Sequence, residues 1–125
     1  MSATQTSPAW RPWIMRRGSN VPQAFRWRDD SGPVNMTGVD LRLRITLFDG
    51  TVLDYRAGVD PGFMILDQTD QARWGIFSFQ PSLELTRTLP VEPAPHYEFE
   101  ARRLGIEECI GEGQIVIRGG ENPDG

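Results

Sequence analysis

Apolar and polar residues alternate along much of the chain, with the two-residue period of a half-buried β-strand. The pattern is clearest over residues 41–47, where four aliphatic residues alternate with two arginines and a threonine. Further runs that favour strands cover residues 21–28, 52–56, 63–66, 75–80, 97–102 and 109–118. We expect these runs to form strands, seven or eight in all.

Turn-forming residues separate the expected strands. The Asp-Gly pair at 49–50 favours the tight turn of a hairpin, and the Asp-Pro-Gly sequence at 60–62 indicates another turn. One short helix is expected over residues 82–89, because Ser82 is a suitable N-cap and two leucines follow at helical spacing. Turn signals about every 8 to 12 residues predict an all-β sandwich, with a barrel as the alternative.

The two ends of the chain do not follow the strand pattern. Residues 1–12 are polar and interrupted by prolines, yet they carry Trp10, and Trp13 follows directly. Aromatic residues are depleted in disordered segments and enriched at interfaces. Two interpretations stay open: both rings pack on the domain's own core, or the segment lies on a neighbouring subunit. We therefore expect a docking arm over 1–15, a sandwich over 16–118 and a flexible tail over 119–125.

Composition and charge narrow the classes of function. The chain has 125 residues, enough for one domain, and a formal net charge of −4, which disfavours non-specific binding to nucleic acid. The single cysteine, Cys109, has no partner for an intrachain disulfide, which is consistent with a reducing compartment. There is no apolar run long enough for a membrane helix and no signal-peptide core, so we expect no membrane partner.

Residues suited to catalysis or metal binding are sparse. The one histidine, His96, lies among prolines, and Cys109 begins an apolar strand, where a buried, inert thiol is the expected state. One Cys and one His do not make a zinc site. Glu98 and Glu100 share the outer face of a strand, where carboxylates are usually only solvated. We therefore predict a protein without enzymatic activity, cofactor or metal.

Several short elements follow one another in a recognisable order. They are Arg17-Gly18-Ser19, a strand with Phe25 and Trp27, Asp30 to Val34 before Met36-Thr37-Gly38, Asp49-Gly50, a strand with Phe77 and Phe79, Thr86 before Leu89-Pro90, Tyr97 to Glu100, and Gly111 to Ile117. Together they resemble the immunoglobulin-like domain of bacteriophage tail and baseplate proteins, similar to the N-terminal domain of baseplate upper proteins. The resemblance spans about residues 16–118 and implies an immunoglobulin-like antiparallel β-sandwich that docks onto other virion proteins.

The leading hypothesis is therefore a structural subunit of a phage virion, in the tail, neck, baseplate or capsid decoration. It would be made in the host cytoplasm and assembled in several copies with other virion proteins. Trp10, Trp13, Arg16 and Arg17 are the predicted interface residues. The alternative is a carbohydrate-binding module for adhesion to a host surface, with Trp74 or Tyr55 stacking on sugar rings. A small hydrolase is the third possibility, and fold analogy supplies no site for it.

Overall fold

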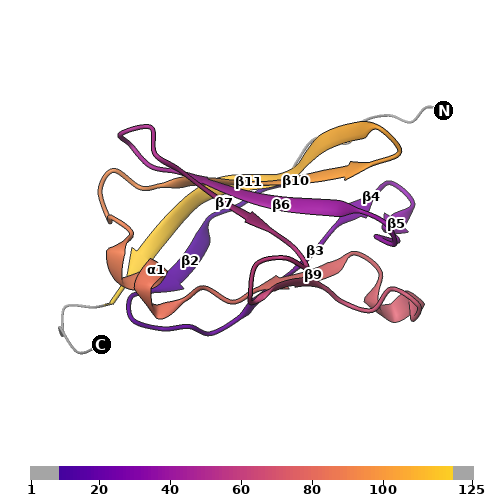
Figure 1. Ribbon diagram of the computed structural model, residues 1–125, viewed down its shortest axis with the longest axis horizontal. Helices are drawn as coiled ribbons and strands as arrows, with labels where there is room; N and C mark the ends of the chain where they lie inside the picture. The colour runs from indigo at the N-terminus through magenta and orange to yellow at the C-terminus, as the bar shows by residue number, and fades with distance from the viewer. Residues whose placement is uncertain (1–8, 120–125) are drawn as a thin grey trace.

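The computed structural model describes residues 9–119 and consists almost entirely of strands (Figure 1). Residues 1–8 of the predicted arm and 120–125 of the predicted tail lie outside the described residues. The strands are β1 (Ala9–Trp10), β2 (Trp13–Arg16), β3 (Gln23–Arg26), β4 (Arg28–Asp29), β5 (Gly32–Pro33), β6 (Asp40–Thr46), β7 (Val52–Arg56), β8 (Phe63–Ile65), β9 (Ile76–Phe79), β10 (His96–Arg103) and β11 (Ile106–Arg118). The helices are a 3-10 turn, η1 (Gln71–Arg73), and α1 (Leu83–Thr88).

The strands form two layers (Figure 1). The larger sheet has the order β1–β11–β10–β6–β7, and β2 continues beside β11 after β1. The second sheet has the order β3–β9–β8, and β4 with β5 forms a small separate ribbon. Pairings are antiparallel except those of β1 and β2, which both run parallel to β11.

This strand order defines an immunoglobulin-like β-sandwich. Immunoglobulin domains place strands A, B, E and D in one sheet and G, F and C in the other, to which variable-type domains add C′. Here β3, β9 and β8 take the places of B, E and D, while β11, β10, β6 and β7 take those of G, F, C and C′. The expected all-β sandwich is confirmed, and the barrel alternative is wrong for the residues that the structure describes. Eight strands have three or more residues, and the expected short helix is α1.

The core is built around one indole that contacts both sheets. Trp13 is 3% exposed, and its ring centroid lies 5.1 Å from Phe25 and 5.6 Å from Phe79 in the second sheet. In its own sheet the ring lies 5.2 Å from Tyr97 and 5.8 Å from Phe99. The first three pairs are edge-on and the pair with Phe99 is stacked, and aromatic pairs in both geometries stabilise a core beyond the area they bury. Trp13 therefore joins the two layers of the sandwich.

The burial of β2 corrects the predicted domain boundary. Trp13 pairs with Ile115 and Met15 with Ile117, so both side chains face the core, where Met15 is 4% exposed. Residues 13–15 belong to the sandwich and not to a docking arm. The pairing is parallel and joins segments about a hundred positions apart, and for this reason the local pattern of the N-terminal residues did not reveal it.

A contact between two phenylalanines stands where antibody domains have their disulfide. In those domains a conserved tyrosine near the start of strand F precedes the second cysteine by two residues. Tyr97 has this position on β10, and the residue two places later is Phe99, which lies 4.8 Å from Phe25 of β3 between ring centroids. The tyrosine hydroxyl donates a 2.7 Å hydrogen bond to the carbonyl of Arg11. Aromatic packing thus links the sheets in a chain with a single cysteine.

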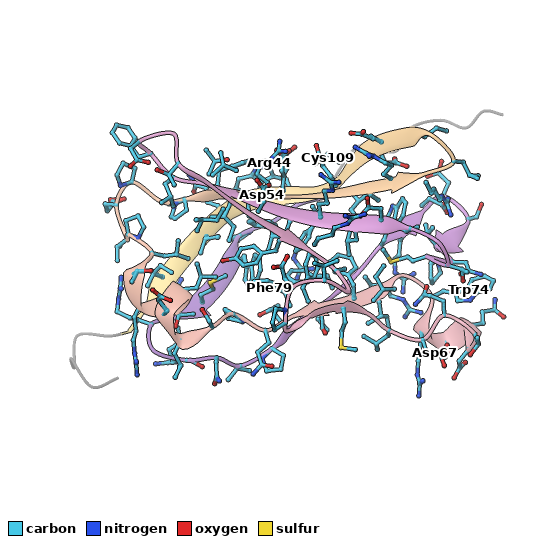
Figure 2. The ribbon with its side chains drawn as sticks, in the orientation of Figure 1. Arg44, Asp54, Asp67, Trp74, Phe79 and Cys109 are labelled. Carbon is cyan, nitrogen blue, oxygen red and sulfur yellow. The ribbon has the colours of Figure 1, made fainter. Side chains whose placement is uncertain are left out.

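On the outer face of the larger sheet, side chains of opposite charge lie next to each other on neighbouring strands. Arg44 and Arg42 of β6 stand directly opposite Glu98 and Glu100 of β10. On its other side Arg44 donates to Asp54 of β7 at 3.4 Å, a contact that raises the pKa of Arg44, as the nearby Glu100 does to a smaller extent (Figure 2). Opposite charges across neighbouring strands support the sheet register. Glu98 and Glu100 therefore belong to a cross-strand charge ladder.

Removal of the central indole tests this description of the core. We expect Trp13→Ala to lower the free energy of unfolding by about 3 to 5 kcal/mol, the usual loss for a large buried aromatic side chain. Chemical denaturation followed by circular dichroism measures the change. Ile14→Ala is the matched control, because Ile14 is the next residue on the same strand and is 51% exposed. Equal effects of the two substitutions would contradict the assignment of Trp13 to the core.

Candidate functional site

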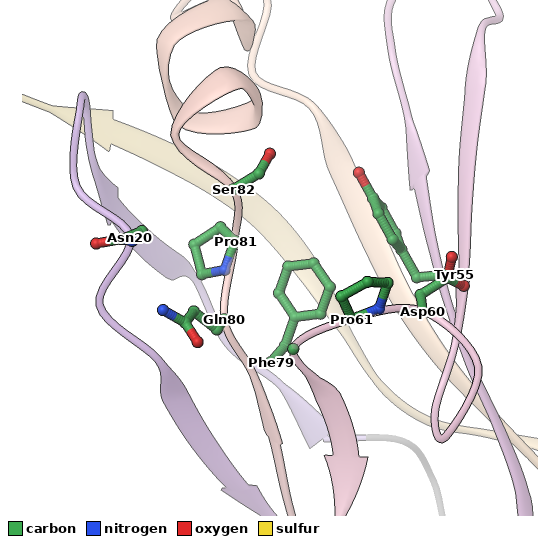
Figure 3. Close-up of a pocket in the computed structure, with 9 residues that line it drawn as sticks. Asn20, Tyr55, Asp60, Pro61, Phe79, Gln80, Pro81 and Ser82 are labelled. Atoms are coloured by element: carbon green, nitrogen blue, oxygen red, sulfur yellow. The ribbon is translucent and has the colours of Figure 1, made fainter.

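A cleft of about 340 Å³ opens between β7 and the segment that leads from β9 to α1 (Figure 3). Tyr55 comes from β7, Phe79 from the end of β9, and Asp60 to Gly62 from the loop between β7 and β8. Gln80, Pro81 and Ser82 connect β9 to α1, and Asn20 reaches the cleft from the loop between β2 and β3. Three stretches that are distant in sequence, at residue 20, residues 55–62 and residues 79–82, therefore form this cleft.

The walls of the cleft are fixed by short contacts. The Asp60 carboxylate accepts a 2.7 Å hydrogen bond from the backbone N–H of Arg56, and the Gln80 N–H donates to the carbonyl of Gly62 at 2.9 Å. Gly62 has φ +85°, and a Cβ there would lie 2.9 Å from the Gln80 carbonyl oxygen, so the close approach requires glycine. The Ser82 hydroxyl accepts from the N–H of Leu85 at 3.0 Å, which confirms its predicted role as N-cap of α1.

The aromatic and proline residues that line the cleft favour an apolar group as its occupant. The acidic side chains at the cleft favour a positive charge next to that group. Tyr55 packs edge-on against Phe79 at 5.1 Å, and prolines 61 and 81 complete the apolar lining. Burial raises the pKa of Tyr55, and the negative charges of Asp60 and Glu84 raise it further. Asp60 and Ser82 each accept a hydrogen bond from the backbone, and the side-chain amides of Asn20 and Gln80 complete the polar part of the lining.

The two residues predicted to stack on sugars lie in different places. Tyr55 lines the cleft, whereas Trp74 lies at the end of the sandwich, in the loop that follows η1 (Figure 2). The Trp74 indole N–H donates to the carbonyl of Gln68 at 2.8 Å, and the buried Gln68 amide in turn accepts from the N–H groups of Met36 and Gly75. Trp74 is thus half-buried as part of a structural loop.

The four predicted interface residues do not form one surface. Trp13 is in the core, so its predicted role as an anchor on a neighbour is wrong, because β2 turns its indole inward. The Arg17 guanidinium donates to the carbonyls of Arg87 and Leu89 at 2.7 and 3.1 Å, at the C-terminal end of α1. Trp10 and Arg16 are exposed. They pair with residues six positions apart on β11, a separation of about 20 Å along a strand.

The tip of the hairpin between β10 and β11 is an exposed feature that the sequence pattern did not reveal. Leu104 is 94% exposed and Ile106 is 63% exposed. Leu104 has φ +52° and Gly105 has φ +77°, the left-handed values of a tight hairpin turn. The Leu-Gly pair between two strand-forming runs was the available signal, and Glu107 and Glu108, which follow it, lie within β11.

Cys109 and His96 lie apart on the larger sheet. Burial raises the pKa of the Cys109 thiol to about 11. Cys109 stands opposite Glu100 of β10, whereas His96 begins that strand and lies 3.4 Å from the carboxylate of Glu112. Within residues 9–119 no group of three or more His, Cys, Asp or Glu side chains is arranged to hold a metal ion. Among the same residues no helix has the length and apolar character needed to cross a membrane.

Comparison with known proteins identifies no family. No protein-family model matches the chain, and no curated protein matches it. Among solved structures it is similar to "Crystal structure of Dscam1 isoform 7.44, N-terminal four Ig domains", with a TM-score of 0.43 and 10% sequence identity. That alignment covers 92% of this chain and 24% of the other, so the chain spans about a quarter of its length. The fold assignment rests on the strand order described above.

Thiol alkylation tests the environment of Cys109. With a pKa of about 11, only about one thiol in a thousand is ionised at pH 8, and we expect slow alkylation by iodoacetamide in the folded chain. The rate should rise steadily between pH 8 and pH 10, and unfolding in urea should accelerate it strongly at pH 8. Mass spectrometry of quenched samples measures both effects. Fast labelling of the folded chain at pH 8 would contradict the burial of this thiol.

Proposed function

We propose that the chain is a non-enzymatic structural subunit of a bacteriophage virion that docks on other virion proteins through Trp10. The observation that carries the proposal is the placement of this side chain. Trp10 lies on a strand that is hydrogen-bonded to β11, so its backbone is held, yet 61% of the residue is exposed. Tryptophan is among the residues that most often dominate the energy of a protein–protein contact.

The direction of the indole supports an external contact. Trp10 pairs with Glu112, and residues paired across neighbouring strands point to the same face. The alternate residues Gly113 and Ile115 of β11 are buried, so Glu112 and Trp10 face outward. An anchor fixed in this way loses little conformational entropy when it binds.

The order of sequence motifs supports the virion as the setting. The Arg-Gly-Ser element, the turn at 30–33, the Thr-Gly turn and the closing Gly-Glu-Gly strand resemble the immunoglobulin-like domains of phage tails and baseplates. That resemblance implies a position in the tail, neck, baseplate or capsid decoration. It also implies several copies per particle and synthesis in the host cytoplasm. Immunoglobulin-like sandwiches serve many functions, so the fold alone does not choose among them.

A carbohydrate-binding function is the second candidate, favoured by Tyr55 in the cleft. A sugar ring requires an accessible aromatic face and several free donors and acceptors. Phe79 is only 2% exposed, and Asp60 and Ser82 are engaged by the backbone. Of the two aromatic rings in the cleft, only the half-buried Tyr55 thus has a face that a sugar could contact, which places this function second. Binding on a glycan array that is lost with Tyr55→Ala would reverse this order.

Substitution of the anchor tests the proposed function. In the phage whose genome encodes the chain, we expect Trp10→Ala to reduce incorporation into particles at least tenfold while the melting temperature of the isolated chain stays unchanged, since the indole is external. Quantitative mass spectrometry of purified particles measures the amount.

Phe48→Ala is the control, because Phe48 is an aromatic residue with 80% exposure on a different hairpin. Incorporation of the Trp10→Ala chain at the level of the control would exclude Trp10 as the anchor. Absence of the unaltered chain from purified particles would exclude the virion assignment itself.

A further inference from the structure

The tip of the β10–β11 hairpin combines two unfavourable features in one residue. Leu104 is 94% exposed, and φ +52° places it in the left-handed region, which costs free energy for leucine, whereas glycine and asparagine adopt it readily. A hairpin turn of this kind normally has asparagine or aspartate at the first position, as in Asn-Gly. Neither the exposure nor the strain contributes to the stability of the isolated domain, which points to a role for the apolar side chain outside it.

The cleft lined by Tyr55, Pro61, Phe79 and Pro81 has the complementary properties. Its volume of about 340 Å³ is large enough to admit an aliphatic side chain, which would contact these four apolar residues. It lies beside the start of α1, and the hairpin extends at the other end of the molecule (Figure 1). One chain therefore does not place its own tip in its own cleft, and the contact joins two copies.

Charge favours the β10–β11 hairpin over the β6–β7 hairpin, which carries the exposed Phe48, as the occupant of the cleft. Asp60 lines the cleft, and Glu84 is close enough to influence Tyr55. Beside Leu104, the Arg103 side chain contacts the carbonyl of Asn35 and the ring of Trp27, neither of which neutralises its charge. Arg102 and Glu107 form an ion pair with each other, and Glu108 lies farther from the tip, opposite Ala101, so Arg103 is the charge next to Leu104. The hairpin with Phe48 carries Asp49 instead, whose negative charge repels an acidic cleft.

We propose that Leu104 of one copy inserts into this cleft of a second copy, so that the chain associates with itself head to tail. The two surfaces belong to different elements, so the contact is heterologous, and its repetition gives a ring or a filament. The contact is independent of Trp10 and adds to the proposed function a way to arrange several copies.

The first part of the test is the mass of the purified full chain over a range of concentrations. Sedimentation equilibrium up to about 1 mM detects even a millimolar contact. We expect a mass that rises above 14.1 kDa with concentration. Leu104→Asn should hold the mass at that of the monomer without loss of thermal stability, because asparagine accepts the left-handed conformation. Phe48→Asn is the matched control and should associate like the unaltered chain.

The second part pairs a tip variant with a cleft variant. Gln80→Arg places a positive charge at the cleft that repels Arg103, and Gln80 is exposed, so the fold should be retained, as thermal unfolding will check. This variant should also be a monomer. A mixture of Leu104→Asn with Gln80→Arg retains one intact tip and one intact cleft, and should therefore form a dimer but nothing larger.

A monomer at every concentration, association by Leu104→Asn, or a mixture that stays monomeric would each overturn the proposal. Glycan binding by a chain that is always monomeric would likewise overturn it and would assign the cleft to sugars. Particle incorporation distinguishes this inference from the proposed function. A monomeric chain whose incorporation still depends on Trp10 removes the self-contact and leaves the proposed function standing.

Discussion

The whole sandwich depends on the packing of Trp13 between its two sheets. Immunoglobulin domains of antibodies join their layers with a disulfide next to a buried tryptophan on strand C. This chain has one cysteine, and the tryptophan comes from β2, beside the last strand. Its ring contacts Phe25 and Phe79 in one sheet and Tyr97 and Phe99 in the other. Aromatic contacts thus hold the two sheets together in place of a disulfide, and they do not require the oxidation of cysteines.

The position of Trp13 also determines the position of Trp10. Between them Arg11 and Pro12 connect β1 to β2 alongside β11, where the Arg11 carbonyl accepts the hydrogen bond of Tyr97 and its N–H donates to the carbonyl of Glu112. Gly113 lies against Arg11, and a Cβ there would overlap the Arg11 carbonyl oxygen. These contacts hold the connection in place, with the Trp13 indole in the core and the Trp10 indole exposed.

The local sequence pattern predicted the strands and the helix that form from residues close together in the chain. The run at 41–47 became β6, residues 52–56 became β7, and Ser82 caps α1 as expected. The parallel pairing of β2 was missed, because it depends on residues about a hundred positions away. The cleft was missed for a similar reason, since its walls come from three stretches that are distant in sequence. Tyr55 was identified as a candidate from its residue type, without any indication of its neighbours.

Two tryptophans in adjacent strands thus have opposite roles in this account, and their solvent accessibility distinguishes them directly. The most direct measurement is oxidative footprinting of the free chain and of purified particles, with the rate for each tryptophan read by mass spectrometry. The account predicts fast oxidation of Trp10 and slow oxidation of Trp13 in the free chain, and protection of Trp10 in particles. Equal oxidation rates for Trp10 and Trp13 in the free chain would contradict the placement of Trp13 in the core. A Trp10 that stays equally reactive in particles would contradict its role as an anchor.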